Sequence, residues 1–82
     1  GPIAHGPAKL SVKGRMWITK LSDNVGSVTL SGVAMDNKTV ATFMARIEKS
    51  DFFSGAELYQ VAHTEQDGLR LKQFEMRCFK SE

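Results

Sequence analysis

The sequence predicts an α+β domain in which two β-hairpins flank one amphipathic helix. Apolar and polar residues alternate with a period of two in four segments, as in half-buried strands. Between the second and the third of these segments, apolar residues recur at the 3.6-residue spacing of a helix. Turn-forming residues separate the members of each strand pair. The length of 82 residues corresponds to one small domain.

The first predicted strand, Met16–Leu21, carries large apolar residues on both sides. Its β-branched and aromatic residues favour an extended conformation. Met16 and Ile18 compete with Trp17 and Leu21 for the buried face, because successive side chains of a strand point to opposite faces. We therefore expect both faces of this strand to be covered.

A polar turn over Ser22–Gly26 is predicted to join this strand to a second one over Ser27–Ala34. In the second strand Val28 and Leu30 alternate with hydroxyl-bearing residues, so one face is apolar and the other polar. The two strands form the first hairpin.

The helix is predicted to begin after Asp36, whose carboxylate can accept a hydrogen bond from a backbone N–H group in the first turn. The apolar residues that follow have the i, i+3, i+4, i+7 spacing of one helix face, and they are Val40, Phe43, Met44 and Ile47. Such a short helix needs a sheet beneath this face, because helix propensity alone does not offset the entropy lost on folding.

The second hairpin is predicted after an exit turn at Ser54–Gly55. The third strand covers Glu57–His63, and a polar loop over Thr64–Gly68 closes with an Asp-Gly pair. The fourth strand follows over Leu69–Phe79.

The apolar alternation of the fourth strand changes phase between Leu71 and Phe74. One extra residue in a strand shifts the alternation in this way. We therefore expect a β-bulge at Lys72–Gln73.

The order of these elements predicts the sheet topology. A right-handed crossover through the helix places the third strand parallel to the second, with a gap that the fourth strand fills. The predicted sheet order is 3-4-2-1 with antiparallel neighbours, a ferredoxin-like sheet with one helix. Since one helix cannot cover four strands, we expect the sheet face near Trp17 to be bare.

Composition excludes several classes of protein. A net charge of +2 is too small to predict nucleic-acid binding, which needs a concentrated basic stripe. The single cysteine excludes an intrachain disulfide, and Cys78 alternates with Phe74 and Met76 like a small buried hydrophobe. No apolar run approaches the roughly 18–20 residues that span a bilayer.

The residues that could carry chemistry have structural interpretations that fit better. His5 and His63 lack a cysteine or paired carboxylates at ligand spacing, so no metal or other cofactor is predicted. Asp36 is better explained as a helix cap than as a general base. Because no paired acid and base emerges, the sequence predicts a protein that is not an enzyme.

Exposed aromatic residues are the better candidates for function, since they commonly anchor protein interfaces. The adjacent pair Phe52–Phe53 is expected to divide its roles, with one ring in the core and the other toward a partner. The predicted partner-interface residues are Trp17, Leu21, Phe52, Phe53 and Tyr59.

Two segments of the chain carry a family resemblance, the strand end Leu-Ser-Gly-Val-Ala over Leu30–Ala34 and the helix end Ile-Glu-Lys-Ser-Asp-Phe-Phe over Ile47–Phe53. With them, the chain resembles the PilN family of fimbrial assembly proteins, which belong to type IV pilus machines. The strand Trp17–Leu21 precedes these segments, and Leu58 and Phe74 follow. The resemblance covers residues 15–79.

The resemblance implies a periplasmic domain of a bacterial inner-membrane protein, built from two helix–strand–strand units. The first family helix is missing or truncated here, and it would lie over the first two strands. Residues 1–12 are expected to be a disordered tail with a tag remnant, and residues 13–82 to be the domain.

The resemblance also implies partners. The domain would form a homodimer or a heterodimer with a PilO-like protein. A cytoplasmic PilM-like partner would be reached only through the missing N-terminal segment, and the membrane only through a missing anchor helix.

Three alternatives remain from the sequence. Platform proteins of type II secretion share the same plan. A ferredoxin-like nucleic-acid-binding module would use Phe74 and Phe79 for stacking beside Lys72, Arg77 and Lys80. A small enzyme of acylphosphatase-like shape would need an arginine in a phosphate loop after the first strand, where the sequence has none.

Overall fold

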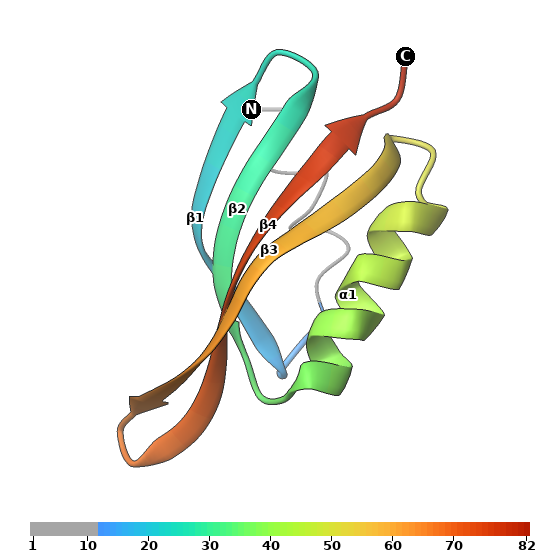
Figure 1. Ribbon diagram of the computed structural model, residues 1–82. Coiled ribbons are helices and arrows are strands. Elements are labelled where there is room, and N and C mark those ends of the chain that lie inside the picture. The colour runs from blue at the N-terminus through green and yellow to red at the C-terminus, as the bar shows by residue number, and fades with distance from the viewer. Residues whose placement is uncertain (1–11) are drawn as a thin grey trace.

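One helix covers part of one face of a four-stranded antiparallel sheet in the computed structural model, which describes residues 12–82 (Figure 1). The elements are β1 (Met16–Asn24), β2 (Ser27–Ala34), α1 (Asn37–Lys49), β3 (Phe53–Gln66) and β4 (Leu69–Lys80). The strand order β1-β2-β4-β3 confirms the predicted ferredoxin-like topology. The predicted tail lies outside the described residues, except for Val12, which packs against the core.

The first hairpin is tighter than predicted. Asn24 pairs with Ser27, so only Val25 and Gly26 form the turn. The positive φ of Gly26, 81°, suits a two-residue turn, because glycine adopts this region without steric cost. The five-residue turn predicted over Ser22–Gly26 is wrong, since its first three residues belong to the strand ladder.

The third strand is longer than predicted, because it already begins at Phe53. The exit turn predicted at Ser54–Gly55 is therefore wrong. A register shift between Phe53 and Gly55 places Gly55 opposite Phe79, so the small residues mark a bulge inside the strand.

The bulge predicted in β4 is also wrong. Lys72 and Gln73 pair in regular register with both neighbouring strands. The apolar alternation changes phase because Leu71 is buried on one face of the sheet while Phe74 is buried on the other. The second bulge of this hairpin lies in β3, between Leu58 and Gln60.

The core lies between α1 and the sheet. The rings of Phe43 in α1 and Phe74 in β4 pack with their centroids 6.2 Å apart and their planes tilted by 54°. Phe74 occupies space that Gly32 of β2 leaves free. The buried residues of the core are Met16, Val28, Leu30, Ala34, Val40, Phe43, Ile47, Phe53, Phe74, Met76 and Cys78.

A register shift between Ile18 and Lys20 determines which side chains of β1 face the core. The shift puts Met16, Ile18 and Leu21 on the core side, where Met16 is buried and the other two pack partly buried against the core. Trp17 points to the opposite face and is 52% exposed, so the expectation that both faces of this strand are covered is wrong. The surface near Trp17 is bare, but it lies on the face away from α1. Incomplete cover by one helix therefore does not explain it, and a helix on the α1 side would not cover it as the resemblance implied.

The start of α1 confirms the predicted cap. The carboxylate of Asp36 accepts hydrogen bonds from the Thr39 backbone N–H at 2.8 Å and from the Thr39 hydroxyl at 2.7 Å. Its second oxygen pairs with Arg15 at 2.7 Å. These bonds lower the pKa of Asp36 below its ordinary value, with the Thr39 hydroxyl as the largest cause.

Substituting Gly32 by alanine should destabilise the domain by about 1–3 kcal/mol. An added Cβ would lie 2.7 Å from the Phe74 ring and 2.7 Å from the backbone carbonyl oxygen of Trp17, which cannot move without disturbing β1. Urea unfolding followed by circular dichroism measures the change. Gly55→Ala is the matched control, since nothing lies within 4 Å of its Cβ position. Equal stability of the two variants would contradict this packing.

The single thiol should react only when the domain unfolds. Cys78 is fully buried, and burial raises its pKa to about 11, so little thiolate forms near pH 8. We expect alkylation by iodoacetamide to be slower in native buffer than in 8 M urea by at least ~100-fold. Mass spectrometry follows the reaction, and rapid labelling of the native chain would contradict the burial.

Replacing Asp36 by alanine should lower the melting temperature at neutral pH by several degrees, because one helix cap and one ion pair are lost. Since the pKa of Asp36 is lower in the folded chain, its stabilising effect is present above the ordinary value of 3.8 and is lost as the pH falls through the folded pKa. Thermal melts between pH 7 and pH 2 should therefore converge for parent and variant. Asp51→Ala, at an exposed position after the helix, is the control.

Candidate protein interaction site

The predicted interface residues lie in three different places. Trp17 and Tyr59 are exposed, by 52% and 45%, on the sheet face opposite α1. Phe52, which is 70% exposed, lies beyond the C-terminal end of α1. Phe53 is only 5% exposed and belongs to the core, while Leu21 packs half-buried against it. The pair Phe52–Phe53 thus places one ring outside and one inside.

The sheet face opposite α1, here called the outer face, carries an apolar area around Trp17. Val33 lies directly opposite Trp17 in the ladder between β1 and β2, and its side chain is buried. Leu71 of β4 is buried on the same face. A large half-exposed indole beside buried aliphatic residues is the kind of surface at which partner proteins commonly dock.

Tyr59 occupies the β3 bulge between Leu58 and Gln60 and also belongs to the outer face. The guanidinium carbon of Arg77 in β4 lies 5.0 Å from the centroid of the Tyr59 ring. This cation–π contact holds both side chains against the sheet and contributes about 0.5–1 kcal/mol at an exposed site. Tyrosine and arginine in such an arrangement are typical of interface anchors.

Phe52 is held by its backbone rather than by its ring. Its N–H donates to the Ser50 hydroxyl oxygen at 3.2 Å, and its carbonyl accepts from the Ser81 N–H at 2.9 Å. These bonds fix the connection between α1 and β3. The ring itself remains in contact with solvent.

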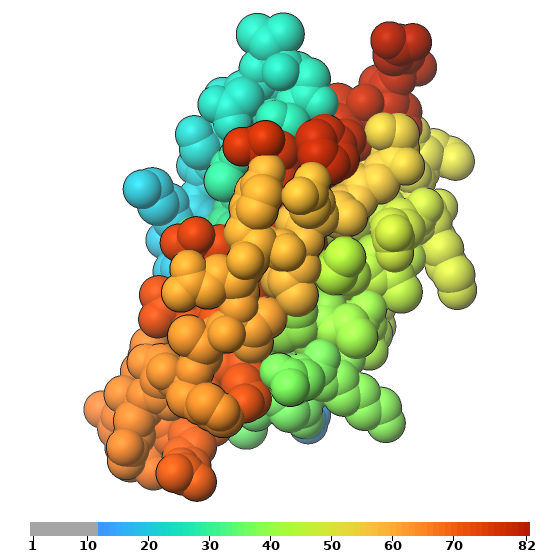
Figure 2. Space-filling model, in the orientation of Figure 1, coloured from blue at the N-terminus to red at the C-terminus, as the bar shows by residue number. Residues whose placement is uncertain are grey.

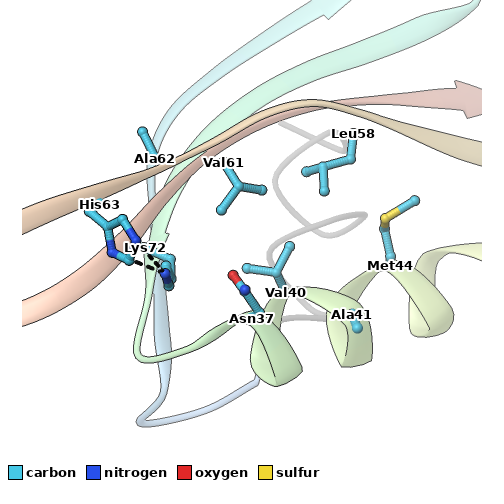
Figure 3. Close-up of a pocket in the computed structure, with 9 residues that line it drawn as sticks. All are labelled: Asn37, Val40, Ala41, Met44, Leu58, Val61, Ala62, His63 and Lys72. Carbon is cyan, nitrogen blue, oxygen red and sulfur yellow. Dashed lines mark hydrogen bonds between the residues drawn. The ribbon is translucent and has the colours of Figure 1, made fainter.

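A groove that the sequence did not predict lies between α1 and β3 (Figure 3). These elements form one side of the molecule, green and orange in Figure 2. The groove, here called the α1–β3 groove, has a volume of about 490 Å³. Its lining residues are Asn37, Val40, Ala41, Met44, Leu58, Val61, Ala62, His63 and Lys72.

One end of the α1–β3 groove is basic. The Lys72 Nζ lies 3.0 and 3.1 Å from the two ring nitrogens of His63. Among residues 12–82, no carboxylate forms an ion pair with Lys72. The apolar residues Met44 and Val61 were the sequence signals for this groove. Met44 was assigned to the buried face of the helix, and Val61 was not singled out.

The basic residues that could serve nucleic-acid binding do not form a stripe. Arg77 lies on the outer face, Lys72 lines the α1–β3 groove, and the Lys80 Nζ pairs with Asp23 at 2.5 Å. Phe74 is fully buried and cannot stack on a base. The geometry therefore does not support the nucleic-acid-binding alternative.

The described part of the chain holds neither a metal-binding cluster nor a membrane-spanning helix. Within residues 12–82, no cluster of three or more histidine, cysteine or acidic side chains is arranged to hold a metal ion. Over the same residues, no helix combines the length and the hydrophobicity needed to cross a membrane.

Comparison with known proteins adds one solved structure and one family. None of the curated proteins matches the sequence significantly. The fold is similar to that of the periplasmic domain of EpsL from Vibrio parahaemolyticus, with a TM-score of 0.70 and 16% sequence identity over 96% of this chain and 89% of that chain. At this identity the likeness establishes the fold alone.

The family comparison extends over most of the sequence. The family model for fimbrial assembly protein (PilN) matches residues 11–79, which include β1, β2, α1, β3 and all of β4 except its last residue. This chain belongs to the PilN family.

Proposed function

We propose that this chain is a non-catalytic, periplasmic interaction domain in the inner-membrane assembly platform of a type IV pilus. It pairs with a second copy of itself or with a PilO-like protein. Membership of a family of fimbrial assembly proteins is the observation that carries the proposal. Its fold, shared with a periplasmic domain of another bacterial protein, agrees with that location.

The distribution of exposed side chains supports pairing through the outer face. Trp17 and the Tyr59–Arg77 pair are all on this face, and all three residue types are enriched in the energetically dominant part of interfaces. Much of the remaining outer face is formed by hydroxyl-bearing residues of β2, namely Ser27, Thr29 and Ser31. Trp17 on β1 and Tyr59 on β3 therefore lie toward the two edges of the outer face, with polar residues of β2 between them. Aromatic anchors together with polar contacts are typical of protein interfaces.

A platform domain of a type II secretion system is the second candidate function. The fold, which is shared with the periplasmic domain of EpsL, agrees with this candidate as well. The two candidates predict different partners, so co-purification separates them. Recovery of pilus assembly proteins from the native bacterium supports the pilus platform, whereas recovery of secretion proteins supports the alternative.

Trp17→Arg should weaken pairing by about tenfold or more, because a charge would replace the largest apolar side chain of the outer face. Sedimentation equilibrium of the chain alone measures the homodimer. Titration with the purified periplasmic domain of a PilO-like protein from the same bacterium measures the heterodimer.

Val25→Arg is the control for this experiment. Val25 is fully exposed at the tip of the first hairpin, away from the centre of the outer face. It introduces the same charge and should leave both equilibria unchanged. A parent chain that stays monomeric and binds no PilO-like domain would contradict the proposed function.

A further inference from the structure

The α1–β3 groove is suited to an apolar ligand that bears a negative charge. Its volume of about 490 Å³ lies in the range of pockets that enclose several side chains. Its apolar wall comes from Val40, Ala41 and Met44 of α1 and from Leu58 and Val61 of β3 (Figure 3). Methionine at such a wall adapts readily to the shape of an occupant.

The charge is concentrated at one end of the groove. Lys72 and His63 line it there and contact each other. Asn37, the first residue of α1, lies at the same end.

Among residues 12–82, no acidic side chain is paired with Lys72, although Glu65 lies on the same face of the sheet, two residues from His63. Arg70 follows on the same face of β4, two residues from Lys72, and lies opposite Glu65 in the ladder. The Asp36 carboxylate is bonded to Arg15 and Thr39 and faces a different pocket. Charge complementarity therefore favours a carboxylate beside Lys72.

The groove is also open to a polypeptide. β3 is an edge strand of the sheet, with no strand beyond it among the described residues. Ala41 of α1 and Val61 of β3, on opposite walls, are both exposed. A segment approaching along this edge reaches the apolar walls and the basic end together.

We propose that the α1–β3 groove binds a short apolar segment of a partner protein, with an acidic residue of that segment paired to Lys72. The inference rests on the proposed function, since it assumes that this domain works by binding other proteins. It goes further by assigning a second surface, on the opposite side of the sheet from Trp17, and the chemistry of its ligand.

A peptide pair tests the charge and the apolar part separately. The probes are acetyl-Ala-Leu-Leu-Glu-amide and the matching peptide with glutamine in place of glutamate. Titration of the isotope-labelled 82-residue chain, followed by ¹H–¹⁵N NMR, should move the backbone resonances of Ala41, Val61 and Lys72. The glutamate peptide should bind about two- to five-fold more tightly, as expected for a solvent-accessible ion pair.

Two variants with matched controls locate the site. Lys72→Gln should abolish the difference between the peptides, whereas Lys20→Gln, on exposed β1, should preserve it. Ala41→Glu should weaken both peptides by occupying the groove with a negative side chain. Ala45→Glu, at an exposed position of the same helix outside the groove lining, should not. Amide spectra of all four variants verify that they fold.

Three outcomes would overturn the proposal. These are no shift at millimolar peptide, equal affinity for both peptides, and movement of the same resonances when the free chain is diluted, which would assign the groove to a second copy. Failure here together with intact binding of a PilO-like domain would leave the proposed function standing. If the chain binds the peptide in the groove but binds no PilO-like domain and no second copy, the groove assignment stands and the proposed function fails.

Discussion

The packing of Phe43 on Phe74 is the contact on which the rest of the architecture depends. Phe74 can occupy the centre of the core side only because Gly32, its neighbour in β2, has no side chain at that point. The ring then meets Phe43 of α1 at a centroid distance of 6.2 Å. A glycine in one strand, an aromatic ring in the next and a second ring in the helix thus fix where α1 lies on the sheet.

The position of α1 determines which surfaces are left for partners. The helix contacts β3 more extensively than β2 or β4, so it lies toward one side of the sheet. β3 and β4 extend beyond β2 as a twisted hairpin that curves away from the start of α1 (Figure 1). The α1–β3 groove lies between the helix and this twisted hairpin.

The sequence was sufficient for topology because the rules involved are local or nearly universal. The order of elements and the right-handed crossover determine the strand order, and the cap at Asp36 depends on residues three positions apart. The faces of β1 could not be predicted, since they depend on a register shift after Ile18 that is defined only by pairing with β2. The bulge predicted in β4 was wrong because Leu71 is buried on the face opposite Phe74. The pattern of a single strand does not reveal on which face an apolar residue is buried.

The candidate site was predictable to the extent that it depends on single exposed side chains. Trp17, Phe52 and Tyr59 are exposed, as expected of partner residues, whereas Phe53 is needed beneath the helix end. The α1–β3 groove could not be predicted from sequence. Its walls come from two elements, and Val40 and Met44 have the same helical spacing as the residues of the core.

Two candidate surfaces on opposite sides of one thin sheet have a mechanical consequence. A protein paired through the outer face would not obstruct a segment bound in the α1–β3 groove, because the four strands separate them. The domain could therefore hold two partners at once and fix their relative orientation. Such alignment requires a rigid layer between the sites, and the buried stack of Gly32, Phe74 and Phe43 supplies one.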